Sequence, residues 1–408
     1  MSFTSGCASA PVPLGRNRDL WVSVVARAVS LLGDEAAVIA LTLRLHDSGG
    51  GAGVVAALLA AGLLPLVVLA GVAGRLVDRY DSRSLLVWSG LGQAAVCTGL
   101  ALVHGRAATL ALVVVLGLGQ AVNGATWQAL VPSIVGPAQL SGAMGLSQAA
   151  RTIAGIAAPA VGGILTGRFG ARVPLLLDAA TFVAVTLAAL LIRAHRAARA
   201  ASPEGRTRGG FAIVRDDPVL AVLLSMLGGF IVLGAMVNVI EVFLVRDTLH
   251  ASATWYGVVG GTWAVGMLAG SLLGGRWSTP PALVRVVLVS SVVLSLSLGG
   301  YGIAPSVAWL LPVAVAGGTA NGLLNLGTGA LTMLRAPEDA RGRVSAAVNA
   351  VASAAMIGAY VLGGTVATFA TPRQIFVASA VLGLFAPIAA ARTLTRTTTT
   401  YQPRAAAL

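Results

Sequence analysis

Three acidic residues stand in the middle of long apolar stretches of this 408-residue chain. Asp34 and Glu35 lie about halfway along the stretch 20–45, and Glu241 lies within the stretch 219–245. Acids at the centre of a bilayer cost about 2.5–3.5 kcal/mol to insert, and those that persist are candidates for function. Carboxyl groups that exchange protons inside a protein are what proton-driven transport requires. We predict that Asp34 and Glu241 are the proton-coupling acids, and Glu35 is the further candidate for this role.

Other charged residues also fall inside apolar stretches. Arg27 precedes Asp34 by two helical turns and could pair with it directly or through a relay; a static structural ion pair is the alternative. Arg151 has no obvious partner on its own helix, which favours a place in a cavity. Asp178 lies toward the outer end of its stretch. We predict that these three residues contribute charge to a central cavity.

Amide side chains on the same kind of stretch are candidates to line that cavity. Asn123 and Asn321 could equally well form hydrogen bonds between helices. The cavity walls are otherwise alanine, valine and leucine, which suits a bulky and fairly apolar small molecule. The predicted substrate-cavity residues are Gln120, Asn123, Gln148, Asn238, Asn321 and Asn325.

Composition indicates that the elements carrying these residues span a lipid bilayer. Hydrophobic residues make up 57% of the chain and charged residues only 10%, whereas a soluble protein carries about a quarter charged residues. The net charge of +13 comes from arginine alone, placed singly in short loops. No basic face or stacking platform accompanies these arginines, so we do not expect a nucleic-acid partner.

Apolar runs long enough to cross the bilayer recur twelve times, since about 20 residues of helix span its core. We therefore predict an all-α integral membrane fold with twelve transmembrane helices in two pseudo-symmetric six-helix bundles. The expected spans are 19–45, 52–74, 84–104, 107–131, 143–167, 172–193, 219–245, 254–275, 282–303, 306–333, 344–369 and 373–391.

Arginine placement predicts the orientation of these spans. Most arginines fall in the segments that share a side with the N-terminus, and the positive-inside rule places that side in the cytoplasm. The chain then divides into a cytoplasmic tail, a six-helix bundle, a cytoplasmic linker, a second bundle and a second tail. The expected bounds are 1–18, 19–193, 194–218, 219–391 and 392–408. Within the linker, Asp216 to Pro218 resembles a helix cap followed by proline at the first helical position.

The two bundles repeat each other in sequence. GVAGR at 71–75 corresponds to SLLGGR at 271–276, and QAVNGAT at 120–126 corresponds to GTANGLL at 318–324. APAVGGILTGRFG at 158–170 corresponds to AYVLGGTVATFAT at 359–371. Three matches in the same order predict duplicated halves with a binding site near the midplane between them.

The stretch GRLVDRYDSR at 74–83 resembles the loop between the second and third spans of the major facilitator superfamily. The departure at Asp81 resembles the enterobactin-exporter-like branch of drug:proton antiporters. That branch also resembles this chain at SLLGDEAAVIALTLRLHDS and at ARGRVSAAVNAVASAAMIGAYVLGG. The resemblance implies a conformational latch on the cytoplasmic side; simple anchoring of the loop is the alternative. The latch residues are Gly74, Asp78, Arg79 and Arg83.

A second stretch, AGIAAPAVGG at 154–163, resembles the fifth-span element of facilitators that export by proton antiport. Ala158 replaces the usual glycine before proline, and Gln120 stands where many drug exporters carry a buried arginine in span four. Arg151 is the candidate substitute for that arginine. The matching residues, which imply close helix packing, are Gly155, Pro159, Gly162 and Gly163.

These features predict a secondary active transporter in the cell membrane that exports a hydrophobic or amphipathic molecule by proton antiport and alternating access. A drug, an antibiotic or a siderophore would fit. A proton-coupled importer of a nutrient, or a receptor that lost transport, is the alternative. Metal-ligand clusters, nucleophile motifs and phosphate loops are missing from the sequence, so we expect no enzyme, metal or cofactor. The expected partners are the substrate, protons and lipid, with the chain acting as a monomer.

Overall fold

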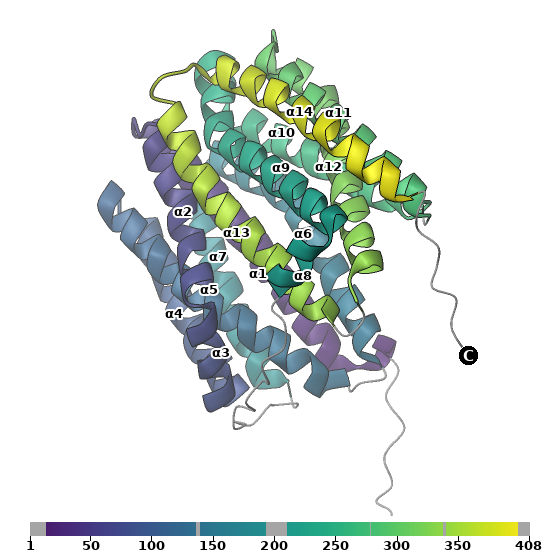
Figure 1. The fold of residues 1–408 in the computed structure, drawn as a ribbon. Helices are drawn as coiled ribbons and strands as arrows, with labels where there is room; N and C mark the ends of the chain where they lie inside the picture. Colours follow the sequence, from purple (N-terminus) through teal and green to yellow (C-terminus); the bar gives the residue numbers. More distant parts are fainter. Residues whose placement is uncertain (1–13, 136–138, 193–209, 278, 338–339, 399–408) are drawn as a thin grey trace, which may run out of the picture.

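The computed structural model describes residues 14–135, 139–192, 210–277, 279–337 and 340–398, which form a bundle of long helices (Figure 1). A short 3-10 helix precedes the bundle and a π-helical turn extends one of its members. The elements are η1 Leu14–Arg16, α1 Arg18–Asp47, α2 Ala52–Val68, α3 Ala70–Arg79, α4 Ser82–Leu102, α5 Arg106–Val135, α6 Leu140–Phe169, α7 Arg172–Leu191, α8 Gly210–Asp216, α9 Pro218–Phe243, η3 Leu244–Thr248, α10 Ala253–Gly274, α11 Pro280–Gly302, α12 Val307–Arg335, α13 Arg341–Val366 and α14 Pro372–Thr398.

The prediction of twelve spans is confirmed. Ten of the described helices are long and apolar enough to cross a membrane. The other two are α1, which carries seven charged residues, and α2, which has only 17 residues and continues into α3 after a break at Leu69. Pro65 lies just before this break, and Gly117 of α5 approaches its ring, because a Cβ on Gly117 would lie 3.0 Å from Pro65 Cγ.

The second half begins at a well-formed helix cap. Asp217 accepts hydrogen bonds from the backbone N–H groups of Val219 and Leu220, and Pro218 occupies the first turn of α9, as the sequence predicted. The short helix α8 lies within the predicted linker, whose residues 193–209 fall outside the described part of the chain. Arg335, at the end of α12, forms an ion pair of 3.2 Å with Asp217 and joins the two helix ends.

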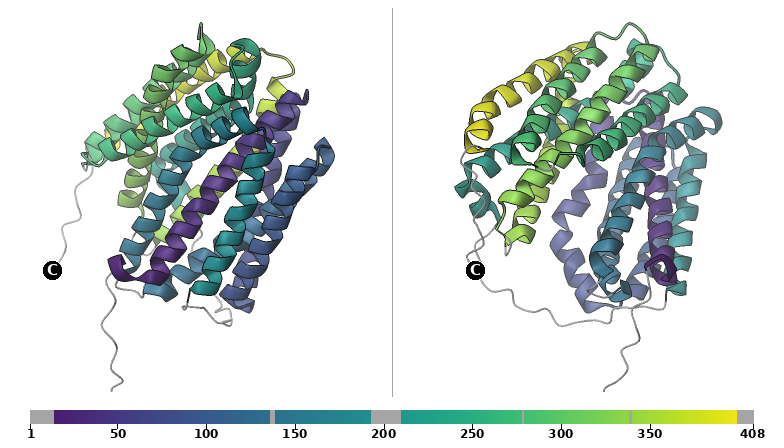
Figure 2. Two further views of the ribbon diagram at one scale, coloured as in Figure 1. Left: turned by 180° about the vertical axis from the view of Figure 1, so that it is seen from behind. Right: turned by 90° about the vertical axis from the view of Figure 1, so that its right-hand side faces the viewer.

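The two halves lie side by side, with α1–α7 on one side and α9–α14 on the other (Figure 2). We call the end of the bundle where α1 begins the terminal end and the opposite end the far end. Near the far end, α6 packs against α10 and α2 packs against α13. Gly163 of α6 meets the backbone of Gly257, and Gly364 of α13 lies so close to α2 that a Cβ would be 2.7 Å from Ala56.

These two contacts give the sequence repeat a physical meaning. Gly163 and Gly364 are the second glycines of the matched GG pairs in the two halves. Each places its helix directly against the second helix of the opposite half, because the missing side chain allows the backbones to approach closely. The duplicated segments are therefore the segments that hold the halves together.

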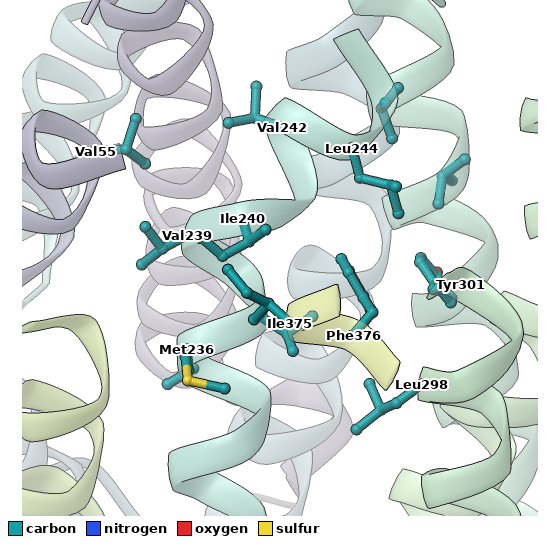
Figure 3. Close-up of a cluster of buried hydrophobic side chains, with 14 of the residues drawn as sticks. Val55, Met236, Val239, Ile240, Val242, Leu244, Leu298, Tyr301, Ile375 and Phe376 are labelled. Atoms are coloured by element: carbon teal, nitrogen blue, oxygen red, sulfur yellow. The ribbon is translucent and has the colours of Figure 1, made fainter. Parts of the chain in front are cut away.

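The largest buried cluster surrounds the C-terminal third of α9. Val239 and Ile240 are almost fully buried, and they belong to the same cluster as Phe376 of α14 and Tyr301 of α11 (Figure 3). Val55 of α2 belongs to the same cluster, so it crosses from one half to the other. This packing holds α9 rigidly in place behind the central cavity.

Candidate central binding site

A cavity system lies between the halves and has three neighbouring compartments. The first, of about 500 Å³, extends between α1, α2, α5 and α9. The second, of about 400 Å³, extends between α1, α6 and the helices of the second half. The third, of about 650 Å³, runs along α1, α5 and α6 toward the terminal end. Glu35 lines all three compartments, so it marks the centre of the site.

The adjacent acids of α1 have different surroundings. Glu35 is exposed to the cavity and forms no hydrogen bond or ion pair with any described residue. Asp34 lines the first and third compartments, but its Oδ1 atom is buried without a hydrogen-bond partner. Arg27, Asp178 and Gln120 are its electrostatic neighbours. The 100° step between successive helical residues explains why the two carboxyl groups diverge.

Arg27 and Arg151 both line the third compartment. Arg27 interacts electrostatically with Asp34 but forms no direct ion pair with it in the described structure. Its guanidinium instead donates a hydrogen bond of 3.5 Å to Asn123 Oδ1. The Asn123 amide in turn donates to Gln93 Oε1 at 3.1 Å. Asn123 is fully buried between helices, so it occupies the interhelical role that the sequence left open.

Glu241 of α9 faces the cavity from the second half. It lines the first and second compartments together with Asn238, one turn earlier on the same helix. Among the described residues, no side chain forms a hydrogen bond or ion pair with it. Tyr256 of α10 and Tyr301 of α11 are close enough to interact with its charge. Two unpaired acids, Glu35 and Glu241, therefore share a compartment from opposite halves.

Asp178 lies outside the cavity, contrary to its predicted role. Its side chain is fully buried and lines none of the three compartments. Cys97 Sγ donates to Asp178 Oδ2 at 3.2 Å, and Thr181 Oγ1 lies 3.2 Å from Asp178 Oδ1. The carboxylate lies against Gly33, where a Cβ would be 2.5 Å away. Asp178 thus bridges α7 to α4 and α1 behind the cavity wall.

The remaining amide candidates divide into two groups. Gln120 lines the first and third compartments, and Gln148 lines the third. Asn325 donates hydrogen bonds to the carbonyl and side-chain oxygens of Asn321 on the same helix, and neither asparagine lines these compartments. The pattern of the sequence could not tell which face of α12 points inward.

Aromatic side chains form a wall of the second compartment that the list of predicted site residues did not include. Trp263 and Tyr301 meet edge to face with ring centroids 6.5 Å apart. Tyr301 and Phe376 are stacked, with centroids 5.2 Å apart and an angle of 8° between the rings (Figure 3). All three line the compartment that also holds Glu35 and Glu241.

The predicted packing motif of α6 lies between the cavity and the far end. Gly155 and Pro159 line the second compartment. Gly162 packs on α1, since a Cβ there would lie 2.9 Å from the Cα atom of Ala36, and Gly163 packs on α10. The motif therefore joins three helices across the two halves, in agreement with the close packing expected of small residues.

Polar side chains add a second closure at the far end. Arg246 donates to Asp47 Oδ1 at 2.9 Å, and the ring nitrogens of His46 lie 3.1 Å from Asp47 and 2.9 Å from Asp247. Asp47 lies at the far end of α1, beyond the predicted span 19–45. Partial burial opposes its ionised form, but hydrogen bonds from His46 and Arg246 outweigh this, so the pKa of Asp47 lies below its ordinary value.

The predicted latch is described only in part. The side chains of Gly74 and Asp78 lie outside the described residues. Arg79 is exposed, and Arg83 donates a hydrogen bond of 2.6 Å to the carbonyl of Ile192 within its own half. Helix α3 packs on α5 and α2 of that half. The latch therefore stays a prediction.

The model of the Major Facilitator Superfamily matches residues 24–278 and 236–407, which together cover most of the chain. The chain belongs to the Major Facilitator Superfamily. This family assignment and the twelve spans agree with the resemblance of the GRLVDRYDSR loop, and they make the protein a multi-pass membrane transporter of this superfamily.

Known proteins similar to this facilitator include exporters. Macrolide efflux protein A of Streptococcus pyogenes is 23% identical over 289 residues, which are 68% of this chain and 71% of that protein. The protein of the same name from Enterococcus faecalis is 23% identical over 60% of this chain and 79% of its own. A bacterial homologue of the human lysosomal transporter Spinster, in an inward-facing and occupied conformation, has the same fold, with a TM-score of 0.74, 12% identity and coverage of 96% and 100%.

Proposed function

We propose that this facilitator exports a hydrophobic or amphipathic small molecule, of the drug or antibiotic type, in exchange for protons. It acts as a monomer in the cell membrane with both termini in the cytoplasm. The observation that carries the proposal is the group of acids, Asp34, Glu35 and Glu241, around a central cavity with mostly apolar walls. The similarity to macrolide efflux proteins supports export as the direction.

The acids support proton coupling because two of them have no other use in the described structure. Glu35 and Glu241 form no ion pair there, and a charged group in a dry cavity is costly unless it is paired or protonated. A proton and a substrate can each satisfy such a group. Their alternate binding links the outward movement of substrate to the inward movement of protons.

The closed far end supports alternating access. The cavity runs from Glu35 past Arg27 and Arg151 toward the terminal end, while the glycine contacts and the Asp47–Arg246 pair join the halves at the far end. In the proposed cycle, substrate enters from the terminal end, the far-end contacts separate, and the substrate leaves on the far side.

Efflux of fluorescent lipophilic dyes from cells expressing the protein tests this proposal. We expect efflux that a protonophore abolishes and that Asp34→Asn or Glu241→Gln reduces at least tenfold. Ser225→Ala is the control, because the Ser225 hydroxyl is exposed outside the cavity and donates only to the carbonyl of Ala221 on its own helix. We expect it to leave efflux unchanged.

Two results would contradict the proposal. Normal efflux by both the Asp34→Asn and the Glu241→Gln variant would exclude these acids from coupling. Uptake of the dyes in place of efflux, at normal membrane levels, would favour the importer, and binding without movement in either direction would favour a receptor.

A further inference from the structure

A further pocket, of about 380 Å³, lies between the two halves at the far end, and we call it the far-end pocket. It shares no lining residue with the three compartments of the central cavity. Arg44 and Thr166 line it from the first half. Arg246, Ser252 and Ala253 line it from the second half, the last two at the start of α10. Since both halves supply its walls, the pocket has this form only while the far end is closed.

The charges around the far-end pocket leave an excess of positive charge. Asp47 also lines it, but its carboxylate is paired with Arg246 at 2.9 Å. The Arg44 guanidinium donates to the carbonyl of Leu100 at 2.6 Å and to the hydroxyl of Thr109 at 3.2 Å, and both of these acceptors are uncharged. Among the residues that the structure describes, no acid forms an ion pair with Arg44. The pocket therefore favours an anion over a cation.

Two polar atoms of the lining side chains, one from each half, form no hydrogen bond. They are Thr166 Oγ1 and Arg246 Nε, and both are buried. A buried polar atom without a partner is costly. The start of α10 adds to these groups, because the first N–H groups of a helix have no partner within it and helix N-termini bind anions. The pocket thus offers hydrogen-bond donors to an acceptor that the chain does not supply.

The size of the far-end pocket favours a polyatomic anion. A water molecule, which is similar in size to a halide ion, occupies about 30 Å³ in the liquid, so a volume of about 380 Å³ exceeds what one halide ion fills. Arginine is well suited to phosphate groups, since its planar fork of N–H donors matches two of their oxygens. Donors from both halves fit a group with oxygens on several sides.

We propose that the far-end pocket binds a phosphate group, either as free phosphate or as part of a lipid headgroup. Arg44 binds it from the first half, and Arg246 and the start of α10 bind it from the second. The pocket lies where the spans end, at a depth that dissolved phosphate and lipid headgroups both reach. This site is separate from the transport cavity, and the inference holds for either direction of transport.

A phosphate group in this pocket stabilises the closed far end. An anion that contacts both halves loses the contacts of one half when they separate, so it binds the closed arrangement more tightly and shifts the equilibrium toward it. Closure of the far end strengthens anion binding by the same factor. The far-end pocket therefore regulates the step in which the far end opens.

The phosphorus NMR linewidth of inorganic phosphate tests the inference. The protein is placed at neutral pH in nanodiscs of digalactosyldiacylglycerol, a lipid without phosphorus, and empty nanodiscs give the baseline. Phosphate that exchanges on and off the protein gains linewidth in proportion to the bound fraction. We expect this excess linewidth to fall at least fivefold in Arg44→Gln and at least threefold in Thr166→Val, because each change removes a hydrogen-bond donor from the pocket.

Arg168→Gln is the matched control. It removes the same charge at the same end of the molecule, from an exposed side chain that does not line the pocket. We expect it to keep the excess linewidth. Arg246→Gln should lose it as Arg44→Gln does, because the anion is held by both halves. A size-exclusion profile shows that each variant is folded before it is measured.

Three results would overturn the inference. The first is the absence of excess linewidth in the wild-type protein, and the second is an equal excess in wild type, Arg44→Gln and Thr166→Val. The third is an equal loss in Arg168→Gln, since binding would then follow net charge alone. Binding that survives Arg246→Gln would contradict an anion shared by the two halves.

Nanodiscs of phosphatidylcholine separate the two sources of the phosphate group, because their headgroups carry a phosphodiester without net charge. Loss of the excess linewidth in these nanodiscs would show that the lipid headgroup occupies the pocket. An excess linewidth that persists there would show that free phosphate is the ligand.

Discussion

Asp34 and Glu35 are neighbours in sequence, yet they meet different groups in space. Glu35 faces the cavity alone, whereas Asp34 lies among Arg27, Gln120 and Asp178 at the cavity wall. A charge beside fixed partners and a charge beside empty space respond differently to an incoming substrate. We infer that Glu35 interacts directly with the substrate, whereas Asp34 responds to it through Arg27 and Gln120, which line the third compartment beside it.

Asp178 illustrates the opposite case, an acid that serves the fold. Its two oxygens lie 3.2 Å from Cys97 Sγ and from Thr181 Oγ1. In Asp178→Asn, one oxygen becomes an NH2 group with two donors. Thr181 Oγ1 can accept from one of them, because its own proton is donated to the backbone carbonyl of residue 178 at 2.8 Å. The second N–H finds no acceptor among the partners of the original carboxylate, at a cost of about 1–3 kcal/mol. We expect a lower melting temperature in detergent, measured by thermal unfolding, with dye efflux at normal levels for the amount of folded protein.

The Asp81→Asn variant is the control for this measurement, since it changes the same functional group at a capping position and should keep its melting temperature. An Asp178→Asn variant that melts normally but no longer exports dye would contradict the structural role and return Asp178 to the transport mechanism.

Sequence reasoning found the acids of the site but not its aromatic wall. Asp34, Glu35 and Glu241 are conspicuous because a charge in an apolar stretch is expensive. Tyr301 and Phe376 give no such signal, since an aromatic residue in an apolar helix is ordinarily part of the core. Asp178 was placed in the cavity because a charge in one helix does not show which neighbour it faces.

Among the elements, α6 and α10 form the closest contact between the halves. In Gly163→Ala, the added methyl group would overlap the backbone of Gly257, and overpacking of this kind costs about 1–3 kcal/mol. We expect the far end to open. Spin labels at Ser48→Cys and Ser306→Cys, in the loops of the two halves at the far end, should report a longer or broader distance distribution by electron–electron resonance.

Gly145→Ala is the matched control on the same helix, because a Cβ at Gly145 would meet nothing within 4 Å. Both substitutions favour the helix equally, so they differ only in the contact with α10. An unchanged Ser48–Ser306 distance in Gly163→Ala would show that this contact does not hold the far end closed.

The polar closure of the far end predicts a pH dependence. The pKa of Asp47 lies below its ordinary value because His46 and Arg246 stabilise its ionised form in the closed arrangement. Ionised Asp47 therefore stabilises the closed arrangement fully above the ordinary aspartate pKa of about 3.9. This stabilisation is lost as the pH falls through the lowered pKa that Asp47 has in the closed arrangement. Asp47 should cause no change in the Ser48–Ser306 distance between about pH 7 and pH 5. Below about pH 4 the distance should lengthen.

In Asp47→Asn the increase of the Ser48–Ser306 distance at acidic pH should disappear, because no carboxylate is left to titrate at that position. His46 and Asp247 face the same cluster from the two halves. A distance that lengthens in the same pH range in both proteins would show that one of these groups, and not Asp47, carries the pH dependence.

Most helix ends lie within about three residues of their predicted positions, although α5 and α14 run on to Val135 and Thr398, past the predicted 131 and 391; the internal breaks were not predicted. Apolar length and flanking arginines mark where a span begins and ends, as at Arg172 for α7 and Pro372 for α14. The division of the second span at Leu69 depends on Pro65 and on its contact with Gly117 of another helix. The sequence of a single span does not show which residue of another span it contacts.

For the whole molecule, the repeat and the cavity have one explanation. Two similar halves, joined through matched glycines at the far end, can rock about a central site without rebuilding their cores. The core around α9 reaches from α14 across to Val55 of α2, so the proposed alternating-access cycle would have to break this shared packing each time the halves separate. The apolar contacts between the halves therefore set part of the barrier to transport.

Orientation in the membrane is the remaining whole-molecule property, and the arginines predict it. Arg75, Arg79 and Arg83 lie at the terminal end, and positively charged loops stay in the cytoplasm. In a background in which Cys7 and Cys97 are replaced by serine, Ser48→Cys at the far end should react with an impermeant maleimide on intact cells. Tyr80→Cys, which is exposed at the terminal end, should react only after the membrane is permeabilised. Labelling in the reverse order would invert the topology and turn the proposed exporter into an importer.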